Sequence, residues 1–82
     1  MARAASRDTV VLGARRKARL EAIVSRASSP QALVRRARIV LLAHARVSNA
    51  EIARRVGCAL NTVRTWRHRF VRGGMPALLD RV

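Results

Sequence analysis

The sequence has few cysteine and aromatic residues and no long apolar run. In 82 residues it has one cysteine, no tyrosine, one tryptophan and one phenylalanine. A single cysteine, Cys58, excludes an intramolecular disulfide, so a cytoplasmic protein is the simplest expectation. The longest apolar run, Ile39 to Ala43, is far shorter than the roughly 20 residues that cross a bilayer. We therefore expect a soluble protein without a membrane partner.

Acidic residues are also scarce. Four acidic residues face 18 basic ones, which gives a formal net charge of +14, and Lys17 is the only lysine. Between Ala22 and Leu79 the only acidic residue is Glu51. Charge of this density repels itself and favours an anionic partner. Because arginine binds phosphate bidentately and counterion release favours dense positive charge, nucleic acid is the expected partner.

Residues for catalysis or metal binding are scattered. The four acidic residues are Asp8, Glu21, Glu51 and Asp80. No pair among them has a spacing for acid–base or two-metal chemistry. His44 and His68 have no cysteine or acidic residue at a metal-ligand spacing. We therefore expect no catalytic residue, no metal site, no cofactor and no enzymatic activity, in a chain that can bury only one modest core.

Helical periodicity predicts an all-α fold, a small bundle of about four helices over residues 13–82, preceded by a basic and flexible arm over residues 1–12. Residues 10–12 are too short an apolar patch to choose between strand and helix. The first helix is expected over residues 14–26, from apolar residues at helical spacing: Leu20, Ile23, Val24 and Ala27. The second is expected over residues 31–45, with one face formed by Leu33, Ala37, Val40, Leu41 and His44. Ser29 is expected to cap it, with Pro30 in the first helical position.

The third and fourth helices have clear end signals. Ser48 and Glu51 have the spacing of a capping box, in which each side chain binds the backbone N–H of the other residue, so a helix is expected from there to about Val56. Gly57 ends it, because glycine takes the left-handed conformation at little cost. The fourth helix is expected over about residues 60–71 and closes at the glycine pair 73–74. A short tail then follows, expected to pack Leu78 and Leu79 against the core.

These two helices have the composition of a helix-turn-helix. The motif needs a small residue in its first helix and a glycine in its turn, which Ala53 and Gly57 provide. Its apolar positions are filled by Ile52, Val56, Cys58, Val63 and Trp66. We interpret Cys58 as a buried structural thiol and Trp66 as the anchor of an aromatic-poor core. A helical bundle without DNA-binding function is the alternative.

The face of the fourth helix opposite Val63, Trp66 and Phe70 is polar. About 100° per residue places on that face Asn61, Arg64, Thr65, His68 and Arg72, flanked by Arg67 and Arg69. Arg64 could read a guanine and Asn61 an adenine in a major groove, while arginines on the flanks hold phosphates. The expected DNA-binding residues are Asn61, Thr62, Arg64, Thr65, Arg67, His68, Arg69, Arg72, Arg54 and Arg55.

Several segments resemble the N-terminal region of bacterial insertion-sequence transposases of the mariner superfamily. They are Leu33–Leu42, Ser48–Arg55, Asn61–Arg64, Trp66 and Leu78–Arg81. In that family the region is a helix-turn-helix that binds terminal inverted repeats, followed by further DNA-binding sequence and an RNase H-like nuclease domain. The resemblance covers about residues 20–81 and implies a nucleoid-associated bacterial protein that binds terminal repeats. The chain stops before the nuclease domain, which leaves a separate nuclease chain as a candidate partner.

The chain differs from that transposase family at the start of the recognition helix, and two other functions are consistent with the sequence. Such transposases often start the recognition helix with serine and arginine, where this chain has Ala59 and Leu60, and the change removes an N-cap worth about 1 kcal/mol. Response-regulator output domains also have a Ser-Asn-x-Glu-Ile-Ala pattern, so a free-standing transcriptional regulator is one alternative. A basic membrane- or partner-binding fragment is the alternative from another class.

Overall fold

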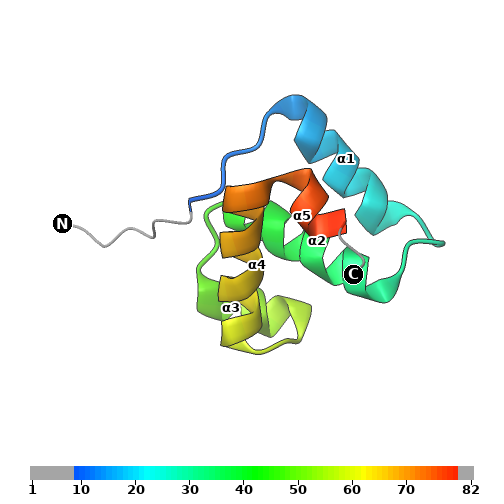
Figure 1. Cartoon of the computed structure of the whole chain (residues 1–82). Helices are drawn as coiled ribbons and strands as arrows, with labels where there is room; N and C mark the ends of the chain where they lie inside the picture. Colours follow the sequence, from blue (N-terminus) through cyan, green and yellow to red (C-terminus); the bar gives the residue numbers. More distant parts are fainter. Residues whose placement is uncertain (1–8, 80–82) are drawn as a thin grey trace.

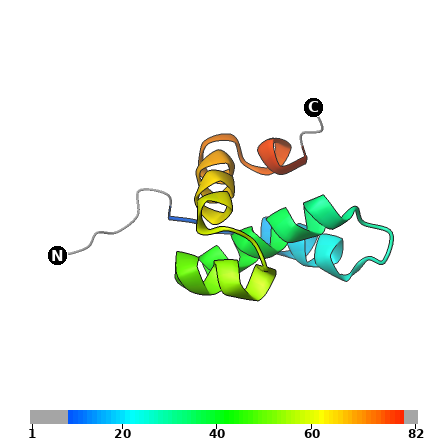
Figure 2. The ribbon, with the colours of Figure 1, turned by 90° about the horizontal axis from the view of Figure 1, so that it is seen from below.

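The computed structural model describes residues 9–79, in which five α-helices and no strand form (Figure 1). The helices are α1 (Ala14–Ser25), α2 (Gln31–His44), α3 (Asn49–Val56), α4 (Leu60–Gly73) and α5 (Met75–Leu79). Helix α2 packs against the other four. Figure 2 shows α4 and α5 as one layer on a second layer of α1, α2 and α3. The predicted all-α fold is confirmed, with a short fifth helix where a tail was expected.

The core lies around α2. The largest fully buried side chains on the helices are Leu20, Ile39, Val40, Ile52, Val63 and Leu78. In α2 the buried residues include Ile39 and Ala43, which lie outside its predicted apolar face, whereas Leu33 and Leu41 are only half-buried. The difference arises because α2 is the central helix and is covered from more than one side. Sequence periodicity predicts a single buried face.

The caps of α2 and α3 differ in part from their predictions. Pro30 has φ −60° and ψ 142°, so it is the extended residue before α2 and not its first helical residue, and its carbonyl accepts the N–H of Val34 (3.0 Å). No side chain caps this helix, so the predicted Ser29 cap is wrong. At α3, the Ser48 hydroxyl accepts the backbone N–H of Glu51 (3.2 Å) as predicted. The second half of the box is wrong, because the Glu51 carboxylate binds two arginines instead.

Gly57 turns the chain between α3 and α4. Its φ of 79° and ψ of 44° are left-handed, as predicted, and a side chain would be strained there. The N–H groups of Gly57 and Cys58 both donate to the carbonyl of Ala53 (2.9 and 3.0 Å), which closes the end of α3. This turn lets α4 cross α3 and completes the helix-turn-helix.

The segment before α1 packs on the domain. Val10 and Leu12 are 2% and 7% exposed, and the N–H of Leu12 donates to Nδ1 of His44 at the end of α2 (3.1 Å). The His44 imidazole therefore accepts at Nδ1. Residues 9–12 belong to the expected arm yet are fixed by these contacts, and they form neither helix nor strand. The rest of the expected arm, residues 1–8, lies outside the described residues.

Helix α5 closes the other end of the core. Leu78 is fully buried, as predicted, but Leu79 is 39% exposed, so the prediction that it packs on the core is wrong. Met75 is buried in its place. The reason is that the tail is helical: residues three apart share a face, which places Met75 and Leu78 inward and turns Leu79 outward.

Candidate nucleic-acid interface

Helix α4 separates a buried face from an exposed polar stripe. Val63 and Phe70 are buried in the core. The exposed stripe on the opposite side consists of Asn61, Arg64, His68 and Arg72. Thr65 lies in the same stripe but is half-buried, and its hydroxyl donates to the carbonyl of Asn61 (2.9 Å). The structure therefore brings four of the predicted residues together on one surface and leaves Thr65 bonded within the helix.

Arg67 lies at the contact between α3 and α4. It is half-buried, and its Nη1 donates to the side-chain oxygen of Asn49 at the start of α3. Thr62 is half-buried as well. The bond from Arg67 joins the first helix of the motif to the second and helps to fix the angle between them. The sequence pattern placed Arg67 on a flank of the DNA-facing surface but could not identify Asn49 as its partner.

Two arginines lie over the ring of Trp66. The guanidinium carbons of Arg36 and Arg69 are 4.2 and 4.8 Å from the ring centroid, within the range of a cation–π contact. Arg36 also donates from Nη1 to the carbonyl of Leu78 (3.1 Å) and so links α2, α4 and α5. Trp66 packs against the core but is half-buried, less than its predicted role as anchor implies.

The role of Arg36 was not predicted, although the sequence contains a signal for it. Arg36 follows Leu33 by three residues and precedes Val40 by four, so it falls at the edge of the predicted inner face of α2. A cation on an inner face needs a partner, since burying it alone is costly. The tryptophan ring and the Leu78 carbonyl are those partners.

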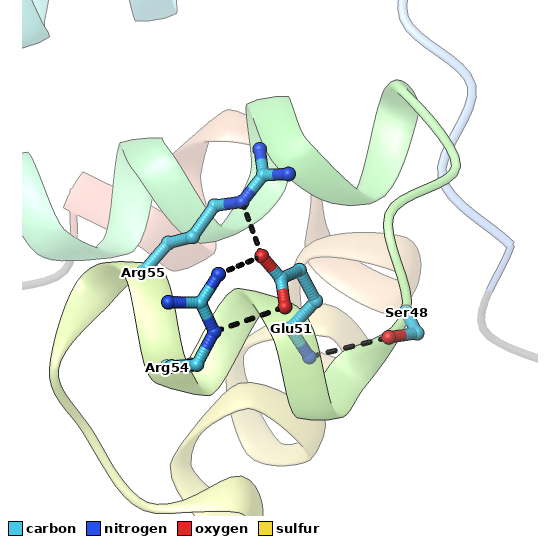
Figure 3. A network of polar contacts seen from close by, with 4 residues as sticks. All are labelled: Ser48, Glu51, Arg54 and Arg55. Atoms are coloured by element: carbon cyan, nitrogen blue, oxygen red, sulfur yellow. Dashed lines mark hydrogen bonds and ion pairs between the residues drawn. The ribbon is translucent and has the colours of Figure 1, made fainter.

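Arg54 and Arg55 are ion-paired within α3 (Figure 3). Arg54 binds both carboxylate oxygens of Glu51, through Nε (3.1 Å) and Nη2, while Nε of Arg55 binds one of them (2.8 Å). The hydrogen bonds from Arg54 and then Arg55 lower the pKa of Glu51 to about 2, and the same contact raises the pKa of Arg54. A DNA phosphate would therefore compete with Glu51 for both arginines.

Arg55 points to a different part of the surface from the α4 stripe. It lines a groove together with Val24, Arg38, Leu41 and Leu42, which belong to α1 and α2. Of the ten predicted DNA-binding residues, the structure therefore gathers four on the α4 stripe and places Arg55 apart from them.

Three further features were predicted: the absence of a metal site, the absence of a membrane-spanning helix, and the burial of the Cys58 thiol. Over residues 9–79, no three histidine, cysteine, aspartate or glutamate side chains gather as a metal site. No helix in that range is long and apolar enough to cross a membrane. Cys58 is half-buried and packs against the core, so it is less enclosed than predicted.

Comparison with known protein families identifies the fold of the helix-turn-helix region. Residues 30–79, which run from the start of α2 to the end of α5, match a family described as a homeodomain-like domain. No curated protein and no solved structure matched the chain. The family match thus includes the helix-turn-helix of α3 and α4 and leaves α1 outside.

Proposed function

The chain belongs to the family of homeodomain-like domains, and from this premise we propose that it binds duplex DNA with a preference for sequence. Helix α4 is the element that enters the major groove. The observation that carries the proposal is the exposed stripe of Asn61, Arg64, His68 and Arg72, which lies opposite the buried Val63 and Phe70. Side chains of this kind on a helix can reach base edges while its other face stays in the core.

The roles of these residues follow from their chemistry and position. Arg64 is exposed near the start of α4 and reads a guanine through O6 and N7, and Asn61 reads an adenine through N6 and N7. Arg69 and Arg72 hold phosphates, joined by His68. The stack on Trp66 reduces the freedom of the Arg69 side chain before binding, so less side-chain entropy is lost on contact.

Other residues of the interface act at its edges. Thr62 and Thr65 contact the backbone or a base edge next to the stripe, and Arg54 contributes a phosphate contact in competition with Glu51. Arg67 and Arg55 belong to the same proposed set, but Arg67 acts mainly through the bond to Asn49 that positions α4.

For the biological role we propose the terminal-repeat-binding part of a transposase, with the nuclease on a separate chain. The support is the resemblance in α2, α3 and α4, including Trp66. Selection of bound sequences from random DNA tests it. The proposal expects a selected site that recurs as inverted repeats around a nuclease gene. Sites upstream of unrelated genes would favour the free-standing regulator.

Two single substitutions test the reading of bases. Arg64→Ala should change which base is preferred at one position of the selected site, at a cost of about 1–3 kcal/mol for the preferred base. Arg69→Ala should weaken binding to all sequences alike and lower the salt dependence by about one unit of slope. Uniform weakening by both variants would refute the role given to Arg64.

A further inference from the structure

Helix α1 carries an arginine ridge that the helix-turn-helix does not use. Arg15, Arg19 and Arg26 follow one another at i, i+4 and i+11, which places them within about 40° of one line along the helix and its C-cap. All three are exposed, whereas Leu20 of the same helix is fully buried. Arg16 is not part of this ridge, because its guanidinium lies over the ring of Phe70 (5.2 Å to the centroid).

Within residues 9–79, no acidic residue forms an ion pair with the ridge. In the described part of the chain the acidic residues are Glu21 and Glu51. Glu21 pairs with Lys17 (3.6 Å), and Glu51 pairs with Arg54 and Arg55. None of the ion pairs among residues 9–79 therefore includes a ridge arginine. Like charges held on one helix face repel one another, and an anionic partner relieves that repulsion.

The ridge lies on a different helix from the stripe on α4. In both views α1 lies to the right of α3 and α4, toward the end of α2 from which the helix-turn-helix is absent (Figures 1 and 2). Helix α1 also precedes residues 30–79, the part that matches the homeodomain-like family. The arginines of α1 therefore lie outside the matched region, and DNA binding by α4 does not account for them.

We propose that Arg15, Arg19 and Arg26 form a second surface that binds the phosphates of duplex DNA. At 1.5 Å per residue the ridge is about 16 Å long, which is long enough to contact several phosphates of a duplex that carries one charge per about 1.7 Å of its axis. We assign phosphate contacts to the ridge and base contacts to α4. The phosphates come either from the duplex that α4 holds or from a second duplex. This inference rests on DNA binding by α4.

The test compares two triple variants that lose the same charge. Arg15→Gln, Arg19→Gln and Arg26→Gln together remove the ridge. The control replaces Arg35, Arg38 and Arg46 with glutamine, which removes three exposed arginines of α2 and the turn after it. Glutamine is nearly as good a helix former as arginine, and circular dichroism verifies that both variants stay helical. Affinity for the selected site is measured in duplexes of 12 and 30 base pairs at several salt concentrations.

The ridge variant should lose about 2–3 units of salt slope on the DNA that the ridge contacts, and the control less than one, with base preference unchanged in both. A loss confined to the 30-base-pair duplex assigns the phosphates to the same DNA. Loss of the ability to hold a labelled second duplex on an immobilised one assigns them to another duplex. Equal losses in the two variants would overturn the ridge proposal and leave α4 binding intact. A wild-type chain that binds no duplex would overturn the proposed function itself, and this inference with it.

Discussion

Replacing Ala59 with serine should stabilise the recognition helix. Ala59 is the residue before α4, is exposed, and has φ −72° and ψ 150°, which is the extended conformation of an N-cap. Its methyl group accepts no hydrogen bond, and the first turn of α4 contains no acidic residue. A serine hydroxyl at this position can accept the N–H of Asn61 without any change of backbone, whereas the N–H of Thr62 already donates to the carbonyl of residue 59 (3.0 Å).

The expected gain in the free energy of unfolding is about 1 kcal/mol, within a range of about 0.5–2 kcal/mol for such caps. For a domain of this size it should raise Tm by about 4–8 °C per kcal/mol. Urea and thermal unfolding followed by circular dichroism measure it. The control is Ala22→Ser, an exposed position inside α1 where serine is a poorer helix former and should cost about 0.5 kcal/mol.

A second substitution separates stability from DNA binding. Ala59→Asp should stabilise α4 at least as well as serine, because a carboxylate also favours the positive end of the helix dipole. It should weaken DNA binding, since a negative charge at the start of α4 repels the phosphates beside the groove. An Ala59→Ser variant no more stable than wild type, or an equal gain from Ala22→Ser, would refute the missing cap as the cause.

The other predictions concern Arg36 and Glu51. Arg36→Met keeps an unbranched apolar stem but removes the cation over Trp66 and the bond to the Leu78 carbonyl. It should lower the free energy of unfolding by about 2 kcal/mol and change the fluorescence of the single tryptophan. Unchanged stability and fluorescence would contradict this role. Glu51→Gln keeps the N–H that Ser48 caps but loses the carboxylate, whose pKa falls from 4.5 to about 2 in the folded chain. A lowered folded-state pKa stabilises above the unfolded value, so wild type should exceed Glu51→Gln in urea midpoint above pH 4.5, and the difference should vanish as the pH falls through about 2. A difference that stays constant down to pH 2 would argue against the ion pairs.

Local signals made most of the helices predictable. Ser48, Gly57 and the Gly73–Gly74 pair each determine a helix end through the backbone of their own neighbourhood, so the sequence alone is enough to place them. The buried positions Val63 and Phe70 follow from the period of one helix. The exposed stripe of α4 is the complement of that buried face, which is why it was predictable too.

Contacts between distant segments were not predictable in this way. The bond from Leu12 to His44 spans 32 residues, and the bond from Arg36 to Leu78 spans 42. Periodicity tells which side of a helix turns inward but not which group it meets there. The core position of Met75 depends likewise on a fifth helix that is too short to show a period.

The ion pairs of Glu51 are a different case, because the spacing of the three residues in the sequence indicates them. Glutamate followed by arginine at i+3 and i+4 is a favourable helical pair. The capping-box pattern offered the same carboxylate a second partner, the backbone N–H of Ser48. In the structure two charged donors prevail over one neutral N–H, as expected for charge-assisted hydrogen bonds.

The most direct test of DNA binding through α4 is a nuclear magnetic resonance titration of the isotope-labelled chain with its selected 12-base-pair duplex. Binding in the major groove through α4 should give the largest shifts at Asn61, Arg64 and His68, with smaller shifts at the buried Val63. Large shifts confined to other helices, with Asn61 and Arg64 unchanged at saturation, would contradict it.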